Sequence, residues 1–284
     1  MSGKVLTIGE SDSCGAAGLQ ADIKTVLALG GYAMTAVSAV AAQNTKGIAH
    51  IETLEPWFIE QQMRIVLEDG ALGMGGGAGA IKVGTLVNAA AVEAVADVLE
   101  SYPSVPAVVD PSIIVRSGSE TVREQIMDEE CFAVLKRRLF VRAAVLTPSL
   151  REAELLTGMK IRDMDDLRHA ADMMRTLGAE AVLLKAGVVP FLPSGKTLYL
   201  LATEGGEELF EQPPIDPQRT LGLGATLASA VAVSLAQGMN VPQAVRRAIS
   251  FLHAAAGVRH GDCAAPLNHA FDIEKAALPK TAKA

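Results

Sequence analysis

Residues 220–235 read Thr-Leu-Gly-Leu-Gly-Ala-Thr-Leu-Ala-Ser-Ala-Val-Ala-Val-Ser-Leu, a turn bracketed by two glycines that leads directly into an apolar run. Such a turn at the start of a helix presents free backbone N–H groups and the positive end of the helix dipole at one point. Proteins commonly hold phosphate groups in this way. We therefore predict an anion site at Gly222 and Gly224, with Ala225 after the second glycine and a helix over Thr226–Ala236.

On either side of this stretch, short aliphatic or β-branched runs alternate with helical patterns. This alternation is typical of βαβ units, and it predicts an α/β fold: a three-layer α/β/α sandwich with a central, mainly parallel sheet. The predicted strands are Val5–Ile8, Met34–Val40, Ala80–Val83, Ala107–Val109, Ala143–Leu146, Ala181–Leu184 and Thr197–Leu201. The other predicted helices are Leu19–Leu29, Pro56–Leu67, Ala89–Leu99, Asp165–Thr176 and Pro242–Ala256.

Length and hydrophobicity favour one large domain over two small ones. The chain has 284 residues, of which 50% are hydrophobic, so it can bury a sizeable core. We expect a single domain over residues 1–270 and a C-terminal tail, residues 271–284, that is partly disordered.

Composition also limits the partners and the location. The net charge is −7 and no basic stripe is present, so nucleic acid is not an expected partner. The apolar runs are far shorter than a bilayer span, so we expect no membrane association. Cys14, Cys131 and Cys263 lie at no metal-ligand spacing, and the N-terminus has no signal-peptide pattern. These features favour a reducing, cytoplasmic location.

Two predicted strands end in a residue that precedes proline. Val109 is followed by Asp110-Pro111, and Leu146 is followed by Thr147-Pro148. Because open α/β sheets bind their ligands beyond the carboxyl ends of the strands, we expect the site at this edge.

Several segments, each weak alone, together resemble one enzyme family. They are Ile8–Ser13, Ala17–Thr25, Ala42–Thr45, Lys82–Gly84, Val109–Pro111, Thr147-Pro148 with Glu152–Glu154, Val182–Lys185 and Pro266–His269. In this order they resemble the hydroxymethylpyrimidine and phosphomethylpyrimidine kinases of thiamine biosynthesis, within the ribokinase-like superfamily. The resemblance implies a ribokinase-like fold, ATP and Mg²⁺ as cofactors, an aminopyrimidine alcohol or its phosphate as substrate, and a homodimer.

The substrate end can be interpreted from the residues as well. An aminopyrimidine presents ring nitrogens and an exocyclic amine in one plane, and the amide of Gln43 offers a donor and an acceptor side by side. Asp22 is expected to reach the amine or the hydroxymethyl group, and Gly9 to let backbone approach the ring. The predicted pocket also includes Val83 and Asp110. Alternatively, Gln43 only turns the chain before the next loop, and Asp22 is a surface residue.

The ATP end departs from the family pattern. The family has asparagine where this chain has Ser149, and the matching acidic residue, Glu152, is expected to help organise Mg²⁺. Lys185 is followed by alanine where the family usually has glycine, yet it can still face the phosphates. We expect three residues to bind ATP: Ser149, Lys185 and Thr220.

The most serious departure is Ala225, because the family places its catalytic cysteine there and alanine cannot take a proton. General-base assistance is typically worth about 10²–10⁴-fold, while phosphoryl transfer depends chiefly on positioning and charge stabilisation. A slow kinase is therefore expected, in which Ala225→Cys raises the rate. Cys14 is a candidate substitute base, but simple loop packing is favoured for it because a thiol near its free pKa is a poor acceptor at pH 7.

Two functions remain open from the sequence. The first is an ATP-dependent kinase of hydroxymethylpyrimidine, its monophosphate or both. The second is a non-catalytic relative that binds a pyrimidine or a pyridoxal-like ligand. A kinase for a different alcohol is a further variant, since Thr85 stands where the family often has methionine.

Overall fold

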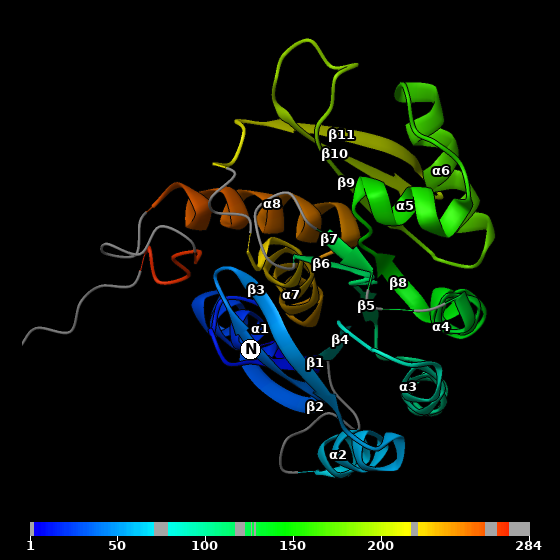
Figure 1. The fold of residues 1–284 in the computed structure, drawn as a ribbon, viewed down its shortest axis with the longest axis vertical. Helices are drawn as coiled ribbons and strands as arrows, with labels where there is room; N and C mark the ends of the chain where they lie inside the picture. The colour runs from blue at the N-terminus through cyan, green and yellow to red at the C-terminus, as the bar shows by residue number, and fades with distance from the viewer. Residues whose placement is uncertain are drawn as a thin grey trace, which may run out of the picture.

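The computed structural model describes residues 3–70, 79–116, 123–125, 127, 129–216, 221–258 and 266–272 (Figure 1). Thr220 and the tail from residue 273 onward lie outside this described part, so the predictions made for them stay predictions.

A nine-stranded sheet forms the centre of the molecule. Its strands are β1 (Lys4–Asp12), β2 (Tyr32–Asn44), β3 (Gly47–Thr53), β4 (Gly79–Val83), β5 (Ala107–Val109), β8 (Ala143–Leu146), β9 (Val182–Val188), β10 (Thr197–Thr203) and β11 (Gly206–Gln212). They lie in the order β11-β10-β9-β8-β5-β4-β1-β2-β3. The strands from β9 to β2 in this order are parallel, and antiparallel pairs close both edges. A separate two-stranded sheet pairs β6 (Ile114–Arg116) with β7 (Arg123–Gln125).

Helices cover both faces of the central sheet, as Figure 1 shows. One face carries α1 (Gly18–Ala28), α7 (Leu223–Ala236) and α8 (Val241–Gly257), whose apolar side chains share one core cluster. The other face carries α2 (Pro56–Glu68), α3 (Ala89–Ser101), α4 (Glu129–Val134), the short helices η1 (Leu135–Leu139) and η2 (Phe140–Arg142), α5 (Leu150–Thr157) and α6 (Met164–Thr176). Successive strand residues alternate between the two clusters: Ile81 and Val83 face one, and Ala80 faces the other.

Helix α7 is buried on nearly all sides. Every residue from Thr226 to Ala236 except Leu235 is buried, because α7 packs between the sheet and the helices α1 and α8. A helix that is apolar all round suits such a central position. Its N-terminus is thereby directed to the carboxyl edge of the parallel strands.

The predicted three-layer, mainly parallel α/β fold is confirmed. The predicted boundaries of α7 were wrong: the helix begins at Leu223, so the second glycine and Ala225 belong to its first turn. The edge strands β3 and β11, the two-stranded sheet, and the helices α4 and α5 were not predicted.

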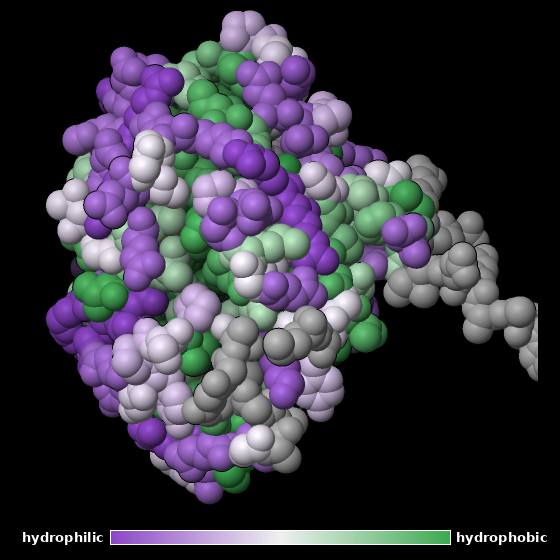
Figure 2. All heavy atoms as spheres, turned by 180° about the vertical axis from the view of Figure 1, so that it is seen from behind, coloured by the Kyte–Doolittle hydropathy of each residue, from purple (hydrophilic) through white to green (hydrophobic). Residues whose placement is uncertain are grey.

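Hydrophilic residues dominate the face seen from behind, with hydrophobic residues showing between them (Figure 2). In the described part of the chain, no helix combines the length and the apolar character that a membrane crossing needs.

Candidate active site

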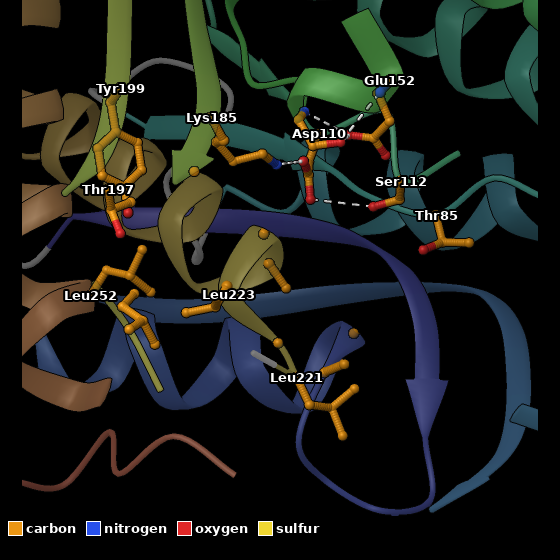
Figure 3. Close-up of a pocket in the computed structure, with 18 of the residues that line it drawn as sticks. Thr85, Asp110, Ser112, Glu152, Lys185, Thr197, Tyr199, Leu221, Leu223 and Leu252 are labelled. Atoms are coloured by element: carbon orange, nitrogen blue, oxygen red, sulfur yellow. Dashed lines mark hydrogen bonds and ion pairs between the residues drawn. The ribbon is translucent and has the colours of Figure 1, made fainter. Parts of the chain in front are cut away.

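A cavity of about 510 Å³ opens at the carboxyl edge of the sheet. Its walls come from the ends of the parallel strands, from the N-terminus of α7 and from α8. In Figure 3, Thr85 and Tyr199 lie on opposite sides of this cavity, with Lys185 and Asp110 between them. The site is therefore where the Asp110-Pro111 and Thr147-Pro148 strand ends predicted a ligand.

The N-terminus of α7 lines the cavity between its Thr85 side and its Tyr199 side. Gly222 caps the helix with φ +82°, in the left-handed region that favours glycine, and a Cβ there would lie 2.0 Å from the Ala16 carbonyl oxygen. The N–H of Thr226 donates to the Gly222 carbonyl at 2.9 Å, so the N–H groups of residues 223–225 precede the first helical bond. These three N–H groups can receive an anion.

An ion pair lies against this first turn. The Lys185 Nζ is 2.7 Å from Asp110 Oδ1, which also accepts from the Thr147 hydroxyl at 3.1 Å. The Ser112 hydroxyl donates to the other Asp110 oxygen at 3.2 Å, and Ser112 has φ +47°. Burial raises the pKa of Asp110, but the ammonium groups of Lys185 and Lys82 and the hydrogen bonds outweigh it, so this pKa lies below its usual value. Asp110 is therefore ionised at neutral pH.

Helix α5 positions Ser149 and Glu152 beside the same pair. Glu152 Oε2 accepts from the Ser149 N–H at 2.7 Å, and the Ser149 hydroxyl caps the helix, which together form a capping box. Glu152 Oε1 accepts from the N–H of Ile113 at 2.9 Å. Glu152 thus ties the loop after β5 to α5. Within the described residues, no cluster of three or more His, Cys, Asp or Glu side chains is placed to hold a metal ion.

The end of the cavity near Thr85 is polar. Gln43 and Glu10 line it, from the carboxyl ends of β2 and β1. The Ser13 hydroxyl holds both backbone groups of Gln43, each at 2.9 Å, and no hydrogen bond of the Gln43 side-chain amide is seen within the described residues. Asn44, rather than Gln43, bonds the turn, because its side chain accepts from the Lys46 N–H at 2.8 Å. The amide of Gln43 remains available to a ligand.

Asp22 lies beneath the cavity wall, fully buried, so the surface alternative was wrong. Its carboxylate is 2.9 Å from Nζ of the buried Lys82 and accepts from the Ser229 hydroxyl at 2.7 Å. Gly9 and Val83 also lie outside the cavity lining, and a Cβ on Gly9 would lie 3.7 Å from the backbone nitrogen of Thr85. The direct contacts predicted for Asp22, Gly9 and Val83 stay predictions, while their positions indicate support for the wall.

The opposite end is largely apolar. Tyr199, Ile215, Val188 and Leu252 line it, and the Tyr199 hydroxyl is 2.9 Å from Nε2 of His253. A flat aromatic or purine ring fits such a lining, since most ligand pockets are apolar with few polar contacts.

Comparison with known proteins identifies the chain. The family model described as phosphomethylpyrimidine kinase matches residues 12–268. The chain belongs to this family. It is 37% identical over 271 residues to the hydroxymethylpyrimidine/phosphomethylpyrimidine kinase of Streptomyces coelicolor, covering 95% of each chain. It is also 37% identical over 278 residues to the thiamine biosynthesis bifunctional protein ThiED of Geobacter sulfurreducens, covering 96% of this chain. The chain spans about half the length of that bifunctional relative, 53%.

Among solved structures, an ADP complex of Bacillus subtilis pyridoxal kinase superposes with a TM-score of 0.80 at 29% identity, covering 95% of this chain and 98% of that one. The predicted family and the ribokinase-like fold are confirmed.

The assignment of the family's catalytic cysteine to position 225, where this chain has alanine, stays a prediction. Ala225 lines the cavity in the first turn of α7, and Cys14 does not line it. The structure brings the anion-site residues together with Asp110, Ser149, Glu152, Lys185 and Gln43.

The sequence interpretation missed Glu10, Ser112 and Tyr199 as cavity residues. Glu10 follows the predicted strand Val5–Ile8 and Gly9 at the carboxyl edge, and this position was a usable signal.

Proposed function

We propose that this chain transfers the γ-phosphoryl group of ATP to the hydroxymethyl group of hydroxymethylpyrimidine, its monophosphate, or both, in thiamine biosynthesis. The observation that carries the proposal is the placement of the α7 N-terminus and the Lys185–Asp110 pair between a polar and an apolar end of one cavity. The names of the relatives support it, because the Streptomyces coelicolor protein is called a kinase of these two pyrimidines.

ATP is proposed to bind with its base at the apolar end, beside Tyr199 and Leu252. Its phosphates would then meet the N–H groups of residues 223–225, where the helix dipole favours negative charge. Lys185 lies 2.7 Å from Asp110 and can shift toward the transferred phosphoryl group, where a point cation stabilises the developing charge.

Mg²⁺ fits the residues present. Asp110 and Glu152 both line the cavity near the first turn of α7, and Mg²⁺ in such sites is bound by one or two carboxylates, phosphate oxygens and water. When bound there, it would neutralise charge on the β- and γ-phosphates. The protein itself positions the reacting groups and excludes water from the cavity.

The pyrimidine is proposed to lie at the polar end. Gln43 offers its amide to the ring nitrogen and the exocyclic amine. In this arrangement the hydroxymethyl group points toward the α7 N-terminus and the γ-phosphate. The non-catalytic alternative receives no support from the relatives, which are named as kinases.

The test is turnover of the purified chain with labelled ATP and Mg²⁺, using hydroxymethylpyrimidine, its monophosphate and pyridoxal as separate acceptors. Phosphorylation of a pyrimidine above the ATPase background supports the proposal. Binding of a pyrimidine without turnover would return the chain to the non-catalytic alternative, and exclusive phosphorylation of pyridoxal would change the substrate.

We also propose that residues 1–270 form one domain, that the chain is a homodimer and that it works in the cytoplasm. The continuous sheet from Lys4 to Gln212 supports the first point, and three cysteines at no metal-ligand spacing are compatible with a reducing compartment. Sedimentation that gives only monomer at micromolar concentration would contradict the dimer.

A further inference from the structure

Three carboxylates line the cavity within the described residues, and two of them are already committed. Asp110 is ion-paired with Lys185, and its lowered pKa makes it a poor proton acceptor. Glu152 accepts hydrogen bonds through both oxygens, from Ile113 and Ser149. Glu10 is the third, and it is held by neither of these arrangements.

Glu10 is placed by rigid backbone. It stands near the end of β1, and after it Asp12 accepts hydrogen bonds from the N–H groups of Cys14, Ala16 and Ala17 at 2.8–2.9 Å. This fixes the loop that leads to Gly18. A Cβ on Gly18 would lie 2.4 Å from the Glu10 carbonyl oxygen and 2.9 Å from its Oε1, so glycine at 18 leaves room for the carboxylate.

The same loop reaches the anion site. Ala17 and Gly18 line the cavity, and a Cβ on Gly222 would lie 3.5 Å from the Ala17 Cα. The Glu10 carboxylate therefore adjoins Gly18 at the N-terminus of α1, one residue from the chain segment that contacts the cap of α7. A substrate alcohol that binds at the polar end, with its hydroxyl directed to the α7 N-terminus, would therefore lie between the Glu10 carboxylate and that N-terminus.

Two charged side chains and one hydroxyl act on the Glu10 carboxylate. Lys82 on β4 attracts its carboxylate, Asp22 on α1 repels it, and the Thr85 side chain after β4 hydrogen-bonds to it. Burial raises the pKa of Glu10, and this effect outweighs the lowering by Thr85 and Lys82. A carboxylate with a raised pKa is a better base at neutral pH than an ordinary one.

We propose that Glu10 is the catalytic base that takes the proton of the substrate hydroxymethyl group, in place of the cysteine that the family resemblance predicts at position 225, where this chain has alanine. This inference rests on the proposed function. As the alcohol oxygen bonds to the γ-phosphorus of ATP, the bond from that phosphorus to the bridging oxygen breaks and ADP leaves. The hydroxyl proton passes to Glu10 and is released to water with the product.

The test compares four forms of the full chain: wild type, Glu10→Gln, Ala225→Cys and the double variant. Glu10→Gln keeps the shape and removes the acceptor. We expect kcat to fall by about 10²–10⁴-fold with the KM for the pyrimidine changed less than about threefold. The acidic limb of the kcat–pH profile should disappear in Glu10→Gln. The double variant should regain at least about tenfold in kcat, with its acidic limb moved toward the ordinary thiol pKa of about 8.5.

Glu52→Gln is the matched control, because Glu52 is an exposed carboxylate on β3 that pairs only with His50 among the described contacts. It should retain the wild-type kcat and pH profile. Urea unfolding of each variant confirms that it is folded.

An unchanged kcat and acidic limb in Glu10→Gln overturns the proposal. So does a loss of pyrimidine affinity that Ala225→Cys does not rescue, since Glu10 would then act in binding. A wild type that binds pyrimidine and ADP without turnover overturns the proposed kinase function, and the base assignment with it, but not the ligand class. A wild type that binds neither overturns the ligand class as well, whereas turnover that Glu10→Gln leaves unchanged overturns the base assignment alone.

Discussion

The Nζ of Lys185 lies 2.7 Å from Oδ1 of Asp110, directly over the first turn of α7. A Cβ on Gly224 would come within 2.9 Å of Asp110 Oδ2 and 3.3 Å of the same Nζ. The cation, the carboxylate and the helix N-terminus therefore meet at one point without an intervening side chain. The Lys185 ammonium can therefore change its partner from the Asp110 carboxylate to a phosphate bound at the α7 N-terminus without crossing the cavity.

The first prediction concerns Lys185. Replacing it with methionine keeps most of the aliphatic length and removes the charge, so we expect kcat to fall by about 10²–10³-fold, as for loss of one electrostatic contact to the transition state. The control is Lys196→Met, which breaks an exposed pair with Glu211. Steady-state kinetics on both variants check this, and equal kcat values would remove Lys185 from the phosphoryl site.

The second prediction is the pH dependence of stability that Asp110 provides. Its pKa is depressed in the folded state, so it binds its proton less readily folded than unfolded. The stability it contributes is therefore present above the unfolded pKa of about 3.9 and is lost as pH falls through the folded pKa. Asp110→Asn should lower the free energy of unfolding by about 1–3 kcal/mol at pH 7.

The same variant should show a shallower loss of stability below pH 4 than the wild type. Urea titrations from pH 7 to pH 2.5 measure both effects. Parallel curves for Asp110→Asn and the wild type would show that Asp110 does not drive the acid response.

The third prediction concerns the buried pair of Asp22 and Lys82. Lys82→Met leaves the Asp22 carboxylate buried without its cation, and such losses cost about 3–5 kcal/mol. Asp22→Asn in the same chain removes the stranded charge, so the double variant should lose less stability than the sum of the single ones. Arg64→Met, at a half-exposed pair with Glu60, should cost at most about 1 kcal/mol. Additive losses in a double-mutant cycle would show that the pair is not coupled.

The sequence predicts which residues lie together at the candidate site where local chemistry and strand direction decide their positions. Gly222, Asp110 and Lys185 meet because helix starts and parallel strand ends converge at one edge. Helix α5 was missed although Ser149-x-x-Glu152 is a capping-box signature, because its eight residues give too little periodicity.

Other features depend on contacts that no local pattern contains. The strand β11 reads Gly-Glu-Glu-Leu-Phe-Glu-Gln. Its glutamates suit an edge strand, but the segment is a strand only because it pairs antiparallel with β10, and no local pattern shows that pairing. Asp22 and Lys82 are 60 residues apart and meet only because β4 pairs with β1 and α1 packs behind them. Their burial follows from tertiary packing.

The fourth prediction tests the cap of α7. Gly222→Ala places a Cβ 2.0 Å from the Ala16 carbonyl oxygen at φ +82°, so the cap must shift and the N–H groups of residues 223–225 move with it. Gly238 has φ +87° with nothing within 4 Å of its Cβ position, so Gly238→Ala isolates the backbone strain, about 1–3 kcal/mol. We expect Gly222→Ala to lose more stability than Gly238→Ala and to be the only one of the two with a raised Kd for ADP. Equal ADP affinity in both variants would contradict an anion site at this cap.

The last prediction concerns Gln43, whose backbone is fixed by Ser13 and which lines the cavity. If its side-chain amide pairs with the ring nitrogen and the amine, Gln43→Ala removes two hydrogen bonds and should weaken pyrimidine binding by about 1–3 kcal/mol, or about 5–150-fold in Kd. Asn44→Ala is the control, because Asn44 is exposed and bonds only within its own turn among the described contacts. Calorimetry should show the loss for Gln43→Ala alone, with ADP affinity unchanged because the nucleotide occupies the other end. A uniform loss of both ligands would indicate that Gln43 shapes the loop, and an unchanged pyrimidine Kd would move recognition of the ring to Glu10 and Thr85.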